Sequence, residues 1–204
     1  FGQATYEDHY NGGMGSNGLT AARHDVLKND YAGRYPESYD PHVPKDLVYS
    51  GNRSLTETLP VEDGQEIPVG KLILSPTRTY LPVLRQVLEQ HREHVHGLIH
   101  CTGGGQTKVL KFLENAHVIK DNLFDLPQLF RLIQESSGTA WREMYQVFNM
   151  GHRMEIYLPE QHADAIIRIA ADFGIAAQVI GRVEAHNSGA KVTVKSAFGE
   201  FVYT

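Results

Sequence analysis

Strand-like and helix-like segments alternate after Lys71, and this alternation is the feature that most constrains the fold. Runs such as GLIHCT are short and apolar, as buried strands are, whereas TYLPVLRQVLEQHR places Leu81, Leu84 and Leu88 along one predicted helix face. Interleaved elements predict an α/β (α+β) domain, a layered mixed sheet with helices packed on it. The expected helices are 79–92, 104–115, 126–136, 139–149 and 159–174, and the expected strands are 97–102, 116–122, 152–159, 178–185, 190–197 and 200–204.

The last strands are expected to form an antiparallel hairpin, and His-Asn-Ser-Gly (186–189) joins 178–185 to 190–197. Before Lys71 the patterns are weaker. One helix is predicted over 19–35, ending near Gly33, and LILSP (72–76) is predicted as a short strand or extended segment.

Residues 35–70 contain more than half of the nine prolines and only short apolar pieces, which predicts a long connection with little regular structure. Residues 16–204 are expected to form one domain, and 1–15 the end of a segment that precedes it. The chain begins without methionine, which is typical of a processed chain or of a fragment.

The charge balance argues against several classes of function. The formal net charge is -5 and lysines and arginines form no run, so we expect neither nucleic-acid binding nor attraction to an anionic membrane. No apolar run reaches the roughly 18 residues of a membrane-spanning helix. The single cysteine, Cys101, cannot form an internal disulfide, and the cytoplasm is the expected location.

The stretch HCTGGGQTK (100–108) is the first candidate site, through Thr102, Gly103, Gly104 and Gly105. Glycines after a strand allow close approach of the backbone, and the start of a following helix attracts anions. The spacing fits neither the Walker A nor the G-x-G-x-x-G pattern. Two interpretations therefore remain: an anion-binding loop or a structural turn.

Two further loops carry candidate ligands. GGMGSNG opens a helix with Ser16, Asn17 and Gly18, which either face a ligand or cap the helix. SPTRTY places Thr77 and Arg78 before another helix, where Arg78 suits a phosphate or a carboxylate, or lies exposed in a capped turn.

In EMYQVFNMG, Asn149 either turns inward to bind a ligand or caps the helix together with Gly151. No metal site is expected. Four histidines lie close enough in sequence to suggest a metal site: His91, His94, His96 and His100. They extend from a helix end into a strand, so their rings should point in different directions. No general base or other catalytic residue is assigned.

The order of these loops resembles the carboxyl-terminal part of the aminoimidazole ribonucleotide synthetase family, also called phosphoribosylformylglycinamidine cyclo-ligase. That family shows G-x-H-S-N-G, (S/A)-P-T-R-x-Y, H-x-T-G-G-G and E-M-Y-x-x-F-N-x-G segments. SNG, SPTRTY, HCTGGG and EMYQVFNMG are their counterparts here. The resemblance covers roughly residues 12 to 185 without most of 35–70.

The resemblance implies a function in purine biosynthesis, the conversion of formylglycinamidine ribonucleotide to aminoimidazole ribonucleotide. It implies that ATP and Mg²⁺ bind mainly to an amino-terminal domain absent from these 204 residues, and that the full-length enzyme is a homodimer. The ten candidate residues named above would then line the ribonucleotide side of the cleft, and this fragment alone would be inactive.

This chain departs from the pattern at Gly15, where the family usually has histidine, and in the greater length of its 35–70 connection. Two alternatives therefore stay open: a domain of a related ATP-using enzyme with another substrate, or a non-catalytic domain that binds a small anionic metabolite.

Overall fold

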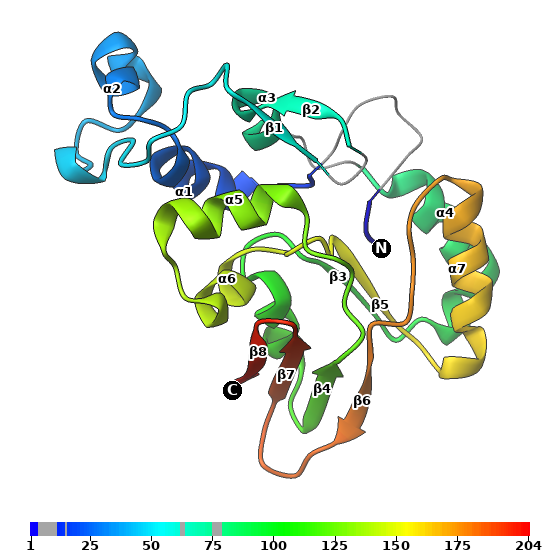
Figure 1. The fold of residues 1–204 in the computed structure, drawn as a ribbon. Coiled ribbons are helices and arrows are strands. Elements are labelled where there is room, and N and C mark those ends of the chain that lie inside the picture. Colours follow the sequence, from blue (N-terminus) through cyan, green and yellow to red (C-terminus); the bar gives the residue numbers. More distant parts are fainter. Residues whose placement is uncertain (4–11, 15, 62–63, 75–78) are drawn as a thin grey trace.

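The computed structural model describes residues 1–3, 12–14, 16–61, 64–74 and 79–204. Helices and strands interleave as the α/β (α+β) prediction requires (Figure 1). No helix among the described residues is long and apolar enough to cross a membrane.

The largest sheet has four strands in the order β6-β4-β7-β8. β4 (Ala116–Lys120) pairs antiparallel with β6 (Gly181–Ala185) and parallel with β7 (Lys191–Ser196), and β7 pairs antiparallel with β8 (Gly199–Tyr203). The mixed sheet is thus confirmed. An antiparallel hairpin at the carboxyl end is also confirmed and is formed by β7 and β8. The pairing predicted for the two strands that 186–189 joins is wrong, because β4 lies between β6 and β7.

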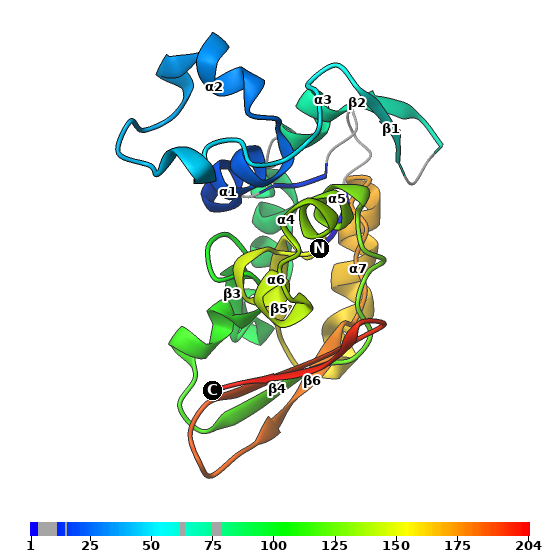
Figure 2. The same cartoon turned by 60° about the vertical axis from the view of Figure 1, so that its left-hand side comes forward.

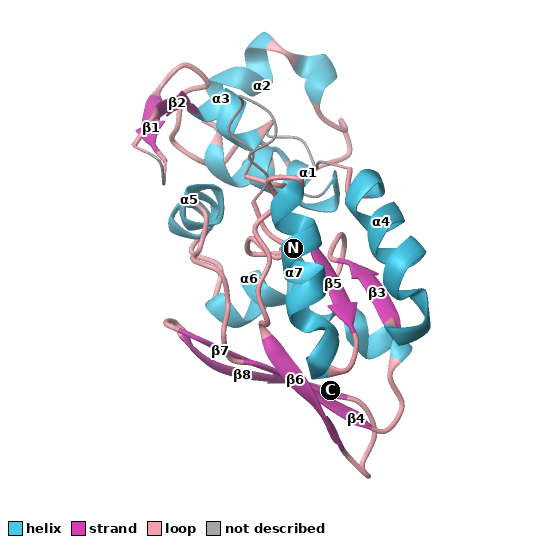
Figure 3. Ribbon diagram, turned by 90° about the vertical axis from the view of Figure 1, so that its right-hand side faces the viewer, coloured by secondary structure: helices cyan, strands magenta, loops and turns pink. Residues whose placement is uncertain are grey.

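A second, two-stranded sheet pairs β3 (Gly97–His100) antiparallel with β5 (Met154–Tyr157). Helices α4 (Leu81–His91) and α7 (Ala163–Asp172) lie side by side against it (Figures 1 and 3). Val83 and Val87 are the buried side chains of α4 in this contact. Leu84 of the predicted leucine face packs against the same cluster, whereas Leu81 is 70% exposed.

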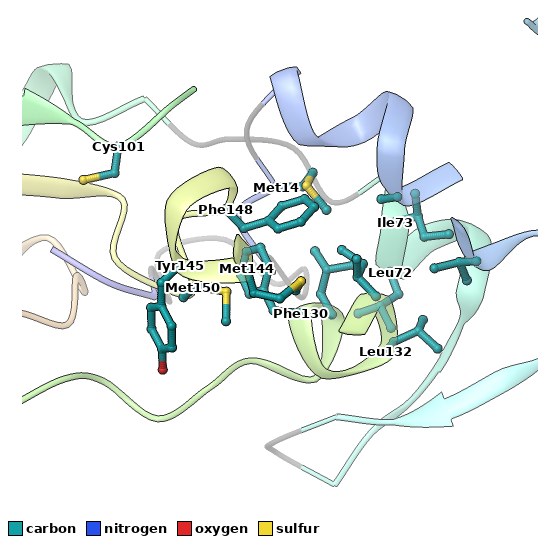
Figure 4. Close-up of a cluster of buried hydrophobic side chains, with 14 of the residues drawn as sticks. Met14, Leu72, Ile73, Cys101, Phe130, Leu132, Met144, Tyr145, Phe148 and Met150 are labelled. Atoms are coloured by element: carbon teal, nitrogen blue, oxygen red, sulfur yellow. The ribbon is translucent and has the colours of Figure 1, made fainter. Parts of the chain in front are cut away.

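The main hydrophobic core is formed by both sheets together with the amino-terminal helices. It includes α5 (Gln128–Ser137), α6 (Trp141–Val147) and side chains such as Phe130, Met144 and Phe148 (Figure 4). The segment predicted as a helix over 104–115 is a 3₁₀ helix, η4 (Gly105–Phe112). Two short 3₁₀ turns, η3 (Arg92–His94) and η5 (Glu160–His162), adjoin α4 and α7.

The predicted helix over 19–35 is wrong at its centre. The chain forms α1 (Ser16–Val26) and α2 (Asp30–Arg34), because Leu27 and Lys28 between them bridge to the backbone of Arg53 and Gly51. The backbone N–H of Lys28 donates to the carbonyl of Arg53 at 3.1 Å, a bond that helical geometry does not allow.

The 35–70 connection is mostly irregular where the structure describes it. It contains η1 (Pro36–Ser38), η2 (Lys45–Leu47) and a small hairpin of β1 (Thr58–Pro60) and β2 (Glu66–Pro68). The predicted strand over 72–76 is wrong in its described part, because α3 (Val69–Ile73) buries Val69, Leu72 and Ile73 on one helical face. Together with α1 and α2, these elements lie at the end of the molecule away from the four-stranded sheet (Figure 2).

Candidate functional site

The glycine loop after β3 needs its glycines for backbone geometry. Gly103, Gly104 and Gly105 all have positive φ, at 55°, 91° and 45°. A Cβ on Gly105 would lie 2.3 Å from the carbonyl oxygen of Phe148, so this glycine admits the end of α6. The nearest atoms to a Cβ on Gly104 would belong to Lys108, at 3.5 Å, so there is more space beside Gly104 than beside Gly105.

Lys108 turns back onto this loop instead of extending away from it. Its Nζ donates to the carbonyls of His100 at 2.9 Å and Thr102 at 2.8 Å. Thr107 Oγ1 donates to the carbonyl of Gly104 at 2.9 Å and closes the first turn of η4. The loop therefore has a fixed shape, with its carbonyls bonded internally.

Asn149 joins three separated segments at one buried point. Its Nδ2 donates to the carbonyl of Gly13 at 2.7 Å, and its Oδ1 accepts from the N–H of Gly151 at 2.9 Å. Its own carbonyl accepts from Gln106 Nε2 at 2.6 Å. Both polar atoms of its side chain are thus bonded within the protein, and this residue holds the glycine-rich segments together.

Gly18 reaches the same place from α1. A Cβ there would lie 2.8 Å from Cε1 of the Phe148 ring and 2.8 Å from Sδ of Met14. Phe148 therefore packs against Gly18 through its ring and against Gly105 through its carbonyl (Figure 4 shows Phe148 beside Met14). Three of the four predicted loops, at 12–18, 102–106 and 149–151, thereby meet.

The structure describes only part of the remaining predicted set. Ser16 and Asn17 were predicted in a loop before the helix that starts at residue 19, but they are the first two residues of α1. Their side chains lie outside the described part of the structure. Thr77 and Arg78 lie outside the described residues altogether. Thr102 is half-buried, and its carbonyl is bonded to Lys108 as above.

A buried ion pair is hydrogen-bonded to this junction. Lys120, 1% exposed at the end of β4, pairs with Glu155 of β5 and so links the two sheets. The same ammonium donates to the backbone carbonyl of Gln106 at 2.7 Å and to its Oε1 at 3.1 Å. Gln106 then donates to Asn149, so the bonds run continuously from Glu155 to Gly13.

Glu155 is nearly enclosed and fully bonded. Its Oε2 accepts from the Tyr157 hydroxyl at 2.6 Å, and its Oε1 accepts from Cys101 Sγ at 3.4 Å. Burial raises the pKa of Glu155, but the Lys120 ammonium and these donors outweigh burial and hold the pKa below its ordinary value. The carboxylate is therefore ionised. Burial, together with this negative charge, raises the pKa of the Tyr157 hydroxyl and of the Cys101 thiol.

His152 is buried beside this pair in its neutral form. Burial, together with the charge of Lys120, lowers its pKa to about 4. Its Nε2 accepts from the N–H of Phe124 at 3.0 Å, and its Nδ1 lies 3.2 Å from the carbonyl of Met150. The ring fixes the turn that carries Asn149.

Sequence reasoning missed Lys120, Glu155, Gln106 and His152. The available signal was a charged residue within each of two apolar strand patterns, AHVIK and MEIY. The prediction about the histidines also did not include His162, whose ring stacks on that of His94 with centroids 3.7 Å apart. Within the residues that the structure describes, no three His, Cys, Asp or Glu side chains are grouped as metal ligands.

The family of this chain follows from a match to a known domain. Residues 47–193 match the model of the AIR synthase related protein, C-terminal domain. The chain belongs to this family. The matched range includes the glycine loop, Asn149 and the Lys120–Glu155 pair, and it begins after α1 and α2.

Curated relatives within this family carry the name phosphoribosylformylglycinamidine cyclo-ligase. The proteins from Bacillus cereus and Bacillus cytotoxicus are each 30% identical over 154 residues, and so is that from Bacillus thuringiensis (strain Al Hakam). In each case the alignment covers 66% of this chain and 42% of the relative. The chain thus spans less than half the length of the cyclo-ligases it matches.

Proposed function

We propose that this chain is the substrate-side domain of a purine-biosynthesis cyclo-ligase, which converts formylglycinamidine ribonucleotide to aminoimidazole ribonucleotide with ATP. The observation that carries the proposal is the junction around Asn149, where the segments at 12–18, 102–106 and 149–151 are bonded together. Relatives named phosphoribosylformylglycinamidine cyclo-ligase support the reaction class.

In this proposal the loop at 102–104 faces the ribonucleotide. Thr102 offers a hydroxyl, and Gly103 and Gly104 bring backbone N–H groups close to an anionic oxygen because no side chain intervenes. Fixed donors stabilise charge that develops on reacting oxygens without a reorganisation cost. Asn149, Gln106 and Lys120 are positioning residues, since their polar atoms are bonded to the loops themselves.

ATP supplies the phosphoryl group that activates the amide oxygen before ring closure. We place the binding of ATP and Mg²⁺ mainly on an amino-terminal domain outside these 204 residues. The described residues do not fit a metal site, because they hold no group of three acidic, histidine or cysteine ligands. We accordingly assign no step of the reaction to a metal-bound group here.

The proposal also includes a homodimer for the full-length enzyme and a location in the cytoplasm. Light scattering of the full-length protein and fractionation of the producing cells test these two points separately. A monomer, or a membrane-associated pool, would contradict them.

The experiment that tests the function measures aminoimidazole ribonucleotide binding by calorimetry on this chain and its formation by the full-length protein. Gly104→Val should weaken binding by about tenfold or more, because a side chain would enter the space where the ligand approaches. Gly138→Val is the matched control. Gly138 also has positive φ, 68°, with no atom within 4 Å of a Cβ, but it ends α5 outside the junction.

Equal affinities of the two variants for aminoimidazole ribonucleotide would move the ligand away from this loop. A second candidate function is a related ATP-using enzyme with another substrate, and Gly15 in place of the family's histidine favours it. Release of ADP by the full-length protein without formylglycinamidine ribonucleotide would support that alternative and reject the cyclo-ligase.

A further inference from the structure

A cavity of about 210 Å³ lies among α1, α2, the 35–70 connection and α3, and none of its lining residues belongs to the glycine-loop junction. Its lining combines tyrosines with aliphatic side chains and one cation, among them Arg23, Tyr31, Tyr35, Tyr49, Leu55 and Ile73. Residues before position 47, where the family match begins, supply half of this lining. Half of the cavity wall therefore comes from a part of the chain outside the matched range.

The aromatic walls are held in place. Tyr31 stacks on Tyr35 with ring centroids 6.3 Å apart and an interplanar angle of 20°. The Tyr31 hydroxyl bonds Ser54 Oγ at 3.0 Å and accepts from the N–H of Leu55 at 2.9 Å. Fixed aromatic and aliphatic walls favour a flat, apolar ligand body, since pockets bind such groups by excluding water from them.

Tyr49 is fixed in the same way from another side. Its hydroxyl bonds Ser38 Oγ at 2.7 Å, and its ring stacks on His24 with centroids 4.9 Å apart. The hydroxyls of Tyr31 and Tyr49 are thus occupied within the protein, so the ligand meets their rings and not their polar ends.

Arg23 is the only charged side chain among the described residues that line the cavity. Its Nη1 donates to the carbonyl of Ser38 at 3.2 Å, while its Nε is buried and has no hydrogen-bond acceptor within the described part of the chain. No carboxylate among the described residues pairs with this guanidinium. The planar arginine fork matches a carboxylate.

We propose that this cavity binds a small aromatic monocarboxylate, with its ring against the tyrosines and its carboxylate on Arg23. A single cation balances a monoanion, whereas a phosphate monoester would bring surplus negative charge. The volume of about 210 Å³ is below the roughly 300–1,000 Å³ of pockets for larger ligands and suits a single ring.

The test is a titration of the 204-residue chain with benzoate. Binding is measured by calorimetry and by changes in the NMR chemical shifts of the ¹⁵N-labelled protein. Benzoate has few atoms, so a dissociation constant in the millimolar range is expected. Benzamide is the neutral control of the same shape and should bind about tenfold more weakly, because it cannot pair with the guanidinium.

Variants assign the binding to this cavity. Arg23→Gln should weaken benzoate binding by about tenfold or more, and Tyr35→Ser should weaken it severalfold. Arg85→Gln is the matched control, because Arg85 lies exposed on α4 and pairs with Glu89 of the same helix; this variant should leave the affinity for benzoate unchanged. Tyr35 is 47% exposed, so Tyr35→Ser keeps the test decisive if Arg23→Gln fails to fold.

Three results would overturn the proposal. The first is an absence of saturable binding up to about 50 mM benzoate. The second is equal affinity for benzoate and benzamide. The third is an affinity for benzoate that is unchanged in both Tyr35→Ser and Arg23→Gln. Failure here leaves the proposed cyclo-ligase function untouched, since the two sites share no residue.

Discussion

Replacing Lys120 by methionine should destabilise this domain, and the loss should grow with pH. Methionine nearly matches the length of lysine but carries neither charge nor donor. In the structure the Lys120 ammonium pairs with Glu155 and donates to two oxygens of Gln106, all within the buried interior. The substitution therefore leaves a carboxylate and two acceptors without their donor.

The magnitude follows from this burial. Removing one partner of a buried ion pair costs about 3–5 kcal/mol, because the remaining charge stays in a poorly solvating interior. This loss is a large part of the roughly 5–15 kcal/mol that stabilises a typical domain. Lys195→Met is the control. Lys195 pairs with Glu200 on the surface, with 49% and 57% of the two side chains exposed, and such pairs contribute about 0–1 kcal/mol.

The pH dependence has a definite sign. Without Lys120, burial should raise the pKa of Glu155 in the folded state above its unfolded value of about 4.3. A carboxyl with a raised folded pKa contributes stability below the unfolded pKa and loses that contribution as pH rises through the folded pKa. The deficit of Lys120→Met relative to the parent should therefore grow as pH rises above the unfolded pKa of about 4.3, by at most about 1.4 kcal/mol per pH unit.

The assay is urea unfolding followed by circular dichroism at several pH values. Lys120→Met/Glu155→Leu should recover part of the loss, because an apolar pair leaves no buried charge. Recovery should be incomplete, since the Tyr157 hydroxyl then loses its acceptor, which costs about 1–3 kcal/mol. A single-variant loss below about 1 kcal/mol, or a deficit independent of pH, would refute the reasoning.

Three further predictions concern the same region. His152 has a folded pKa of about 4, below its unfolded 6.5, so its stabilisation is complete above pH 6.5 and falls by about 3 kcal/mol as pH drops toward 4. His152→Gln should flatten that part of the pH–stability curve, unlike the control His96→Gln; parallel curves would contradict this. Gly105→Ala should cost several times more stability than Gly104→Ala in thermal melts, because a Cβ on Gly105 would lie 2.3 Å from the carbonyl oxygen of Phe148, whereas one on Gly104 would meet Lys108 at an ordinary 3.5 Å; equal losses would reject that packing. Cys101, 2% exposed with a pKa raised by burial, should react with a thiol reagent only after unfolding in urea, and rapid native labelling would show an open path to it.

Much of the order of elements was predictable from local pattern. The stretches that became β3, β4, α5 and α7 show the strand or helix periodicity that they adopt, and their ends fall within a few residues of those expected. The partner of β4 was not predictable, because parallel pairing with β7 joins distant segments. The break after Val26 also depends on a distant contact, with Arg53.

For the candidate site, the sequence pattern drew attention to the glycine-rich loops but left the role of each residue open. Gly105 and Asn149 contact the protein itself, and only tertiary packing reveals this. Lys120 ends a strand, where a lysine is usually solvated, so nothing local distinguishes it from an exposed residue. Its burial depends on Glu155, which lies on another strand.

The position of β4 between β6 and β7 has a consequence for synthesis of the chain. The ribosome completes β4 well before β6 and β7, the two strands that pair with it. Both edges of β4 therefore stay unpaired while some sixty residues, from Lys120 to Gly181, are added. Unpaired edges invite association with other chains. Once made, β6 and β7 are close enough in sequence to pair with each other first, and that local contact would exclude β4. The nascent chain therefore passes through an interval in which its central strand is the most exposed to misassembly.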